Sequence, residues 1–165
     1  YDDVGPEKIE GKIKKRLEPL TVASHYGCHY LKPSHVYSKE EDPEFPSSLD
    51  ELVALTGAKS VDYEEKTQCC GGNILGVDDN ITFNIASRKL DHIKATAVDG
   101  MNLICPLCNI IYDRNQRIIE RRLNKSYGIP VLFYPQILGL ALGLPPEELG
   151  FQMNRVTVSN LLSKI

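Results

Sequence analysis

The sequence contains no long apolar segment, no excess of positive charge and no repeated or low-complexity tract. A membrane-spanning helix needs roughly 20 consecutive apolar residues, and no stretch of this chain approaches that length. The 19 basic residues are outnumbered by 22 acidic ones, and the formal net charge of −3 provides no general attraction to nucleic acid or anionic lipid. No charged and then apolar leader indicates secretion. We therefore expect a soluble, cytoplasmic protein without a nucleic-acid partner or a membrane span of its own, associated with membranes only through partner subunits.

Cysteine is present in an odd number, five, which together with the missing secretory signal argues against a disulfide framework. The cysteines fall in three groups, at Cys28, at Cys69 and Cys70, and at Cys105 and Cys108. Metal binding or redox chemistry is the better explanation for such a set.

The length of 165 residues suits one hydrophobic core and is too short for two ordinary domains. The chain starts at Tyr1, and residues 1–20 resemble a helical connection between domains, so we expect a fragment of a longer protein. We assign 21–150 to the domain itself and 151–165 to a loosely packed tail.

Short apolar segments alternate with helical patterns along the chain. Strands are predicted at 20–25, 59–63, 101–104 and 129–134. Helices are predicted at 6–17, 48–55, 80–98 and 106–127, and from Pro135 onward. Ser47 or Ser48 with Glu51 suggests a capping box at the second helix. The proline-rich segment 31–46 is expected to be a surface loop without regular structure.

Alternation of this kind predicts an α/β fold, a four-stranded, mainly parallel sheet flanked by helices. The third predicted helix would bury a stripe of isoleucine and leucine side chains, namely Ile81, Ile85, Leu90 and Ile93.

Each group of cysteines follows one of the first three predicted strands. The carboxyl ends of parallel strands share one edge of a sheet, and ligands bind in the crevice there. We therefore expect the five sulfur atoms to meet at that edge.

Five sulfur ligands fit an iron-sulfur cluster better than zinc, which takes four tetrahedral ligands. The adjacent Cys69 and Cys70 can reach different irons of one cluster. Gly71 and Gly72 leave room beside it, and their N–H groups can point at sulfide or thiolate. The alternative is a non-catalytic, zinc-binding structural or interaction domain that uses at most four of the cysteines. Zinc could also occupy the site in aerobically produced protein.

Three ordered motifs, HYGCHYLKP, QCCGGN and ICPLCNIIYDRNQ, resemble the cysteine-rich CCG domain, which occurs twice in the B subunit of heterodisulfide reductase. The resemblance extends to the ending PVLFYPQILGLALGLPPEELG and is greatest to the C-terminal half of that protein. It implies a noncubane 4Fe-4S cluster whose ligands are Cys28, Cys69, Cys70, Cys105 and Cys108, with cleavage of a disulfide substrate at the cluster.

The resemblance also implies partners. These are a missing N-terminal CCG domain, a ferredoxin-like electron-transfer subunit and the disulfide substrate, so we expect the isolated domain to be inactive. Related CCG domains belong to succinate, fumarate or lactate-linked oxidoreductase complexes. The heterodisulfide is therefore one candidate substrate among several, and the resemblance does not identify which of them this protein uses.

Several polar residues near the motifs leave two interpretations open. His25 and His29 flank Cys28, and either can ligate metal or donate a hydrogen bond to a cluster sulfur, which would raise its potential. We favour a purely structural role for both and rank His29 above His25 as a supporting residue. Tyr112, Asp113 and Gln116 follow Cys108 and either support the site or serve packing.

Overall fold

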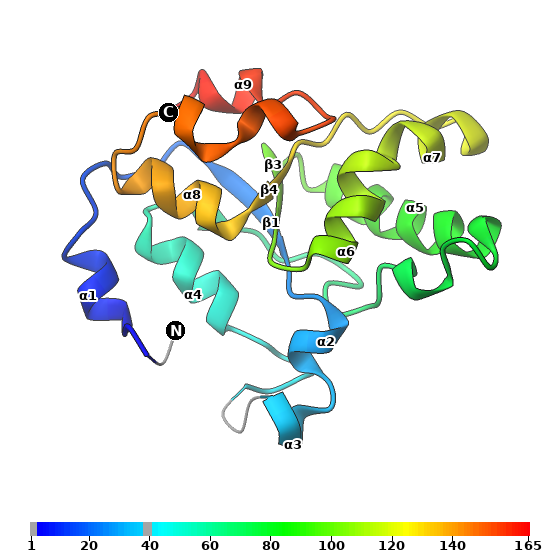
Figure 1. The fold of residues 1–165 in the computed structure, drawn as a ribbon, viewed down its shortest axis with the longest axis horizontal. Coiled ribbons are helices and arrows are strands. Elements are labelled where there is room, and N and C mark those ends of the chain that lie inside the picture. Colours follow the sequence, from blue (N-terminus) through cyan, green and yellow to red (C-terminus); the bar gives the residue numbers. More distant parts are fainter. Residues whose placement is uncertain (1–2, 38–40) are drawn as a thin grey trace.

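The computed structural model describes residues 3–37 and 41–165, and in it a central sheet lies between two layers of helices (Figure 1). The sheet has the order β2-β1-β3-β4, and every pairing is parallel. The strands are β1 (Thr21–His25), β2 (Lys59–Ser60), β3 (Gly100–Leu103) and β4 (Val131–Phe133). The predicted α/β fold class is thus confirmed.

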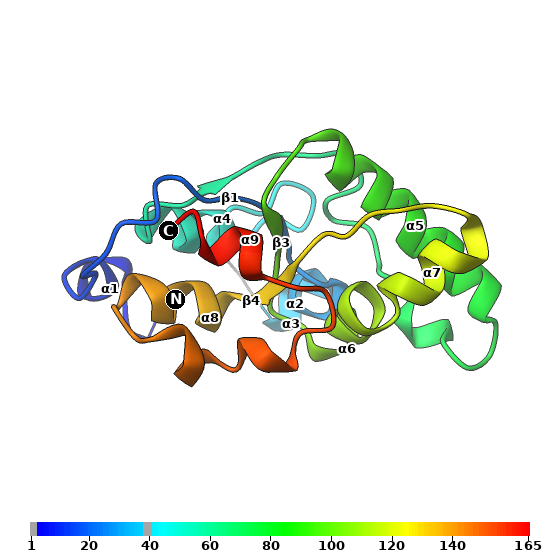
Figure 2. The same cartoon turned by 90° about the horizontal axis from the view of Figure 1, so that it is seen from above.

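The longer helices cover the sheet, and shorter turns lie at its edges and along the C-terminal segment (Figures 1 and 2). The helical elements are α1 (Pro6–Glu10), α2 (Cys28–Leu31), α3 (Ser34–Tyr37), α4 (Ser48–Leu55), η1 (Gly72–Ile74), α5 (Asp79–Ala95), α6 (Pro106–Asn109), η2 (Ile110–Arg114), α7 (Gln116–Leu123), α8 (Tyr134–Ala141), η3 (Pro146–Leu149), η4 (Phe151–Met153) and α9 (Ser159–Leu162). Among the described residues, none of these helices is long and apolar enough to cross a membrane.

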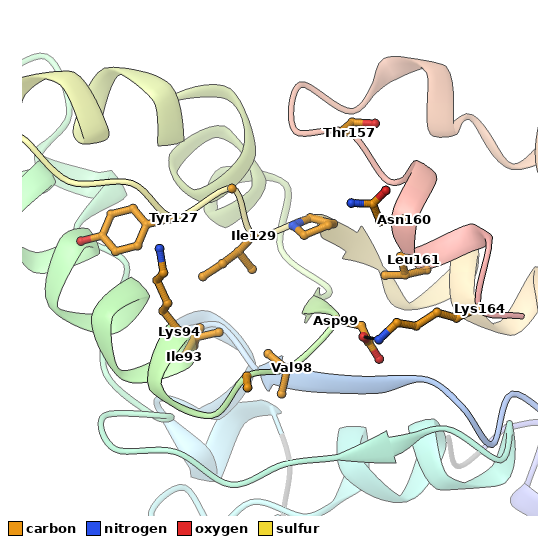
Figure 3. A pocket seen from close by; sticks show the side chains of 13 residues that line it. Ile93, Lys94, Val98, Asp99, Tyr127, Ile129, Thr157, Asn160, Leu161 and Lys164 are labelled. Atoms are coloured by element: carbon orange, nitrogen blue, oxygen red, sulfur yellow. Dashed lines mark hydrogen bonds and ion pairs between the residues drawn. The ribbon is translucent and has the colours of Figure 1, made fainter.

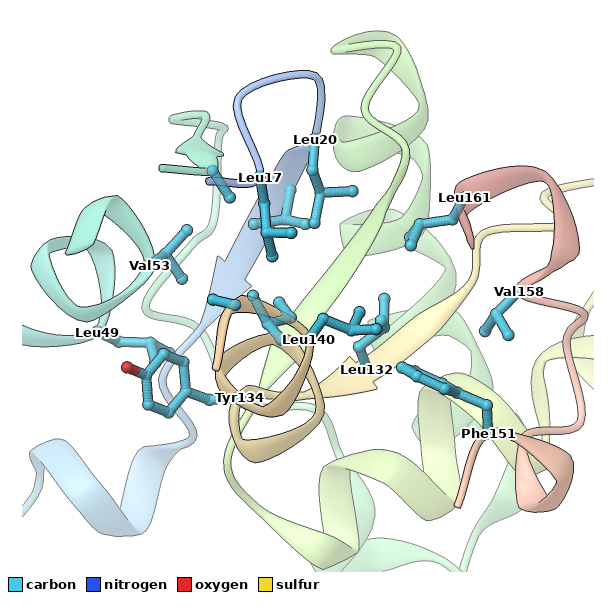
Figure 4. Close-up of a cluster of buried hydrophobic side chains, with 14 of the residues drawn as sticks. Leu17, Leu20, Leu49, Val53, Leu132, Tyr134, Leu140, Phe151, Val158 and Leu161 are labelled. Carbon is cyan, nitrogen blue, oxygen red and sulfur yellow. The ribbon is translucent and has the colours of Figure 1, made fainter. Parts of the chain in front are cut away.

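Two hydrophobic cores lie on opposite faces of the sheet because side chains alternate along each strand. Val22 of β1 and Leu132 of β4 pack with α4 and α8 in the first core (Figure 4). Ala23 of β1 and Met101 of β3 pack with α5 and α7 in the second. His25 lies two positions after Ala23, so its side chain is on the α5 side of the sheet.

The C-terminal segment is well packed, so the prediction of a loose tail was wrong. Phe151, Val158 and Leu161 are buried in the first core. The buried carboxylate of Asp113 accepts hydrogen bonds from the backbone N–H groups of Arg155 and Val156, and these bonds hold the segment against η2.

Several predicted boundaries differ from the observed ones. The helix expected over 6–17 ends at Glu10, since Gly11 follows and the N–H groups of Lys14 and Lys15 donate to the carbonyl of Ala141 instead. The strand expected over 59–63 comprises only β2. The segment 31–46 contains α3, a single turn that begins directly after Pro33; its residues 38–40 lie outside the described part of the chain.

Local helix chemistry accounts for the other differences. Ser47 precedes α4, but its hydroxyl donates to the Glu51 carboxylate and caps no backbone N–H, so the expected capping box does not form. Of the stripe predicted for α5, Leu90 and Ile93 are buried, whereas Ile81 is 49% exposed and Ile85 is half-buried. Phe83 and Ala86 complete the buried face.

The helix expected over 106–127 is interrupted by the π-helical turn η2 and ends at Leu123. Asn124, with φ 51°, takes the left-handed conformation that ends α7, four residues before Gly128.

Candidate metal centre

The five cysteines lie at the carboxyl edge of the sheet, on three separate segments. Cys28 opens α2 directly after β1. Cys69 and Cys70 lie in the segment before η1. Cys105 is the N-cap residue of α6, the helix that follows β3, and Cys108 lies within that helix. His25 pairs with Leu103 in the β1–β3 register, so the segments that follow these two strands leave the sheet side by side.

The sulfur atoms are close together. The Sγ atoms of Cys28 and Cys69 are 4.0 Å apart, and those of Cys70 and Cys108 are 3.5 Å apart. Cys105 lies beside Cys108, since a Cβ at Gly27 would be 3.1 Å from Cys105 Cβ and 3.9 Å from Cys108 Sγ, and Cys69 and Cys70 are adjacent in the chain and belong to different pairs. All five are free thiols, and Cys70 and Cys108 are the buried members. The structure therefore brings together every cysteine that the sequence analysis singled out.

Backbone N–H groups face the sulfurs where the chain carries no side chain. Gly71 N–H donates to Cys69 Sγ at 3.3 Å, and Gly72 N–H donates to Cys70 Sγ at 3.4 Å. A Cβ at Gly72 would lie 3.2 Å from Cys70 Sγ and 2.8 Å from Leu107. The two N–H groups stabilise negative charge on sulfur, and a larger residue at Gly72 would fill the space beside Cys70.

Gly27 has a positive φ and lies in close contact with the site, so alanine at this position should destabilise the protein more than alanine at a glycine far from the site. Gly27 and Gly76 have φ of 80° and 86°, so alanine is strained at both, by about 1 kcal/mol. A Cβ at Gly27 would lie 3.1 Å from Cys105 Cβ, whereas one at Gly76 meets nothing within 4 Å. We expect Gly27→Ala to lower the free energy of unfolding by at least about 2 kcal/mol and Gly76→Ala by about 1 kcal/mol in urea titrations. Equal decreases in the free energy of unfolding would show that Gly27 is required only for its positive φ and not for the space beside Cys105.

Charge is unevenly distributed over the thiols. The pKa of Cys70 is lowered, chiefly because its thiolate accepts a hydrogen bond from the Cys108 thiol and, in addition, one from Gly72 N–H. That same hydrogen bond raises the pKa of Cys108. Burial raises the pKa of Cys28. The edge is thus arranged to hold anionic sulfur at its buried centre.

His25 lies at the site, and His29 is exposed. The Nε2 atom of His25 is 3.2 Å from Cys108 Sγ, and its ring packs edge-on against Tyr112 with centroids 5.3 Å apart. Burial and the charge of Lys89 lower the pKa of His25 far below its ordinary value, so the ring is neutral. The geometry therefore favours His25 over His29 as the supporting histidine.

Lys89 of α5 also lies at the site, and the sequence analysis did not identify it. It is almost completely buried, and its Nζ atom is 3.1 Å from His25 Nδ1. The sequence contains an indication of this role. Lys89 falls between Ala86 and Ile93 on the apolar face of a predicted helix, and a charged residue buried on such a face needs a partner.

Tyr112 is fully buried, and its hydroxyl has no hydrogen-bond partner in the described part of the chain. Burial and, next, the charge of Cys70 raise the pKa of Tyr112, so the hydroxyl is a neutral donor close to the thiols. An orphaned donor beside five thiols fits a group that brings its own acceptors, as the inorganic sulfide of a cluster does. Gln116, by contrast, bonds to the backbone of Tyr112 and Ile129 and serves packing.

The orphaned hydroxyl predicts that phenylalanine is favourable at position 112 when no cluster is bound. Because a buried unsatisfied hydroxyl is costly, Tyr112→Phe should raise the free energy of unfolding of the iron-free chain by about 1 kcal/mol. Tyr127→Phe is the matched control, since the Tyr127 hydroxyl donates to Asp91, and its loss should lower stability by about 1 kcal/mol. Urea unfolding of the two variants measures the difference, and destabilisation by Tyr112→Phe would mean that the hydroxyl has a partner.

Within residues 3–37 and 41–165, no three His, Cys, Asp or Glu side chains are arranged to hold a single metal ion. The thiols approach one another in pairs from three segments. Sulfurs from different segments can therefore reach one bound group.

Two cavities differ in their relation to the cysteines. One of about 390 Å³ adjoins Cys69 and is lined by Gln68, Ile85 and the Arg88–Glu65 ion pair. A second, of about 490 Å³, lies at the amino ends of β3 and β4 (Figure 3). Its lysines are paired, Lys94 with the Ser126 carbonyl and Lys164 with Asp99. Of these two cavities, the one beside Cys69 adjoins the site.

A parallel sheet whose carboxyl edge gathers five free thiols defines a cysteine-rich α/β domain built for metal or redox chemistry. Comparison with known families agrees, since residues 22–111 match CCG, the cysteine-rich domain, and the chain belongs to this family.

Curated relatives include the B subunit of the ferredoxin:CoB-CoM heterodisulfide reductase of Methanosarcina mazei, 42% identical over 100% of this chain and 55% of the relative. A protein of Archaeoglobus profundus, named as similar to the heterodisulfide reductase B subunit, is 37% identical over 90% of this chain and 50% of the relative. The 8-methylmenaquinol:fumarate reductase membrane anchor subunit of Wolinella succinogenes is 30% identical over 94% and 54%. The chain thus spans about half the length of the curated relatives that it matches.

A solved structure, that of a hypothetical protein from Helicobacter pylori, superposes with a TM-score of 0.70 over 92% of this chain and 28% of the other, at 13% identity. At that identity the likeness concerns the fold alone.

Proposed function

We propose that this chain is the iron-sulfur domain of a disulfide-reducing oxidoreductase subunit of the heterodisulfide reductase type. Cys28, Cys69, Cys70, Cys105 and Cys108 would hold a noncubane 4Fe-4S cluster, and electrons would reach a disulfide there. The observation that carries the proposal is the convergence of five thiols from three separate segments, with sulfur separations of 3.5 and 4.0 Å. The relatives named after the heterodisulfide reductase B subunit support it.

Different residues of the chain would stabilise charge on sulfur, admit the substrate and exclude water from the cluster. Cleavage of a disulfide to two thiols consumes two electrons and two protons, and a cluster supplies electrons one at a time. The N–H groups of Gly71 and Gly72 stabilise the negative charge on Cys69 and Cys70. Cys28, Cys69 and Cys105 are only half-buried, so a substrate can approach from their side while Cys70 and Cys108 stay shielded from water.

The partners belong to the same proposal. Because the relatives are about twice as long, we propose that residues 1–20 connect this domain, over residues 21–150, to a second CCG domain that precedes it. A ferredoxin-like subunit would donate electrons, and the disulfide would bind between the two domains. The isolated domain would then bind its cluster without turning over substrate.

Anaerobic purification followed by assays of iron, acid-labile sulfide and zinc tests the proposal. We expect about four irons and four sulfides per chain. Electron paramagnetic resonance of the reduced and oxidised protein then tests whether the cluster is of the noncubane type. Stoichiometric zinc without iron under these conditions would overturn the proposal in favour of a zinc-binding interaction domain.

A further inference from the structure

Lys89 makes three polar contacts on the buried side of the cysteines. Its Nζ atom donates to the carbonyls of Gln68 at 2.7 Å and Lys66 at 3.1 Å, and it lies 3.1 Å from His25 Nδ1. An ammonium group has three protons, so these three acceptors use its full capacity. Gln68 immediately precedes Cys69, and the contacts therefore tie the segment that carries Cys69 and Cys70 to α5.

The contact with His25 determines which ring nitrogen carries the proton. A lysine ammonium is a donor only, so Nδ1 of His25, 3.1 Å from Nζ, accepts from it, and the Lys66 carbonyl beside the ring accepts from the same ammonium. The ring proton then resides on Nε2, which lies 3.2 Å from Cys108 Sγ. Lys89 thus directs an N–H donor of His25 at a cysteine sulfur.

Lys89 also brings positive charge to a site that holds anionic sulfur. Burial lowers its pKa to about 8, so the group is mostly charged at pH 7. The ring of Tyr63 lies 6.0 Å from Nζ on one side, and the carboxylate that acts on Lys89, Glu65, is paired with Arg88. A buried cation near a cluster favours the more negative, reduced state.

We propose that Lys89 is a positioning and charge-compensating residue of the metal centre, which holds His25 as the Nε2–H tautomer, aims that donor at Cys108 and raises the reduction potential of the bound cluster. The inference rests on the proposed function for its cluster, but the tautomer belongs to the chain alone. His25 and Lys89 form one chain of contacts, Lys89 to His25 to Cys108, and each link can be tested separately.

The first measurement needs no cluster. In iron-free protein at pH 7, the imidazole nitrogen shifts in NMR spectra should show the Nε2–H tautomer of His25 in the wild type and in Lys89→Arg. Lys89→Met should allow the Nδ1–H tautomer to appear. Lys94→Met is the matched control, since Lys94 is an exposed lysine of the same helix, and it should leave His25 unchanged.

The second measurement is the midpoint potential of the iron-loaded chain, followed by electron paramagnetic resonance. Lys89→Met removes the buried positive charge that favours the reduced cluster. At the potential where half of the wild-type cluster is reduced, the ratio of reduced to oxidised cluster in this variant should be lower by about tenfold. Lys89→Arg and Lys94→Met should behave like the wild type. An iron-loaded Lys89→Met with both wild-type potential and wild-type tautomer would overturn the role of Lys89.

If Lys89→Met fails to fold or to retain iron, His25→Leu provides the decision. It keeps the lysine and its contacts with the Gln68 and Lys66 carbonyls but leaves no N–H donor at position 25, so its potential should shift in the same direction by a smaller amount. A potential equal to that of the wild type would overturn the proposal. Absence of iron from the anaerobic wild type would defeat the proposed function itself, which the NMR result does not depend on.

Discussion

Replacement of Cys70 by serine should remove essentially all cluster iron and sulfide from this chain. Cys70 is buried, its Sγ lies 3.5 Å from Cys108 Sγ, and its thiolate receives hydrogen bonds from Cys108 and Gly72 N–H. It is thus the centre of the thiol set, and a serine hydroxyl is a far poorer ligand for iron because it remains protonated at neutral pH. Iron and sulfide analysis after anaerobic purification measures the loss.

The effect of Cys70→Ser must be separated from misfolding. Val77→Ser is a suitable control, since Val77 is 87% exposed beyond η1, and it should retain the wild-type iron content. Circular dichroism and urea unfolding of iron-free Cys70→Ser should resemble those of the iron-free wild type, because the side chains differ little in volume. Unchanged iron content in Cys70→Ser would exclude Cys70 as a ligand.

Replacement of Asp113 by asparagine should lower the free energy of unfolding by about 2 to 3 kcal/mol. The Asp113 side chain is 2% exposed, and its two oxygens accept from the N–H of Arg155 at 3.0 and 2.9 Å and from that of Val156 at 3.0 Å. Asparagine retains one acceptor oxygen, removes the charge and directs an amide N–H₂ towards a backbone N–H. The segment that carries Val158 and Leu161 into the first core would then lose its anchor.

Asp42 offers the matched control for this substitution. It is exposed and accepts from the N–H groups of Glu44 and Phe45 in a loop, so Asp42→Asn should change stability by less than about 0.5 kcal/mol. Urea titrations of both variants provide the comparison. Equal changes in the two would mean that the C-terminal segment does not depend on the buried carboxylate.

Local patterns predicted the elements that position the cysteines. The apolar segments around Val22, Met101 and Leu132 are strands, and the alternation of strand and helix requires parallel pairing with crossovers. Since parallel strands end at one edge, the positions of Cys28 and Cys105 after two of these strands were enough to predict their meeting. This inference depended on chain order and needed no side-chain detail.

Local sequence patterns could not predict side-chain contacts between segments that are far apart in the chain. Lys89 and His25 are 64 positions apart, and nothing local to either indicates the other. The helix expected through Lys14 ends early because backbone N–H groups there bond to Ala141, a partner on α8 that the local sequence does not specify.

Patterns in consecutive residues were sufficient to predict the α/β class, the order of strands and helices along the chain and the edge at which the cysteines meet. The hydrophobic period distinguishes strand from helix, and a helix between two strands forms the right-handed crossover that makes them parallel. The packing of distant segments was needed to place His25 rather than His29 at the thiols, Lys89 beside His25, and Asp113 against the C-terminal segment. Those pairings depend on how α5, η2 and the chain end pack against the sheet, and buried polar groups select their partners only once that packing exists.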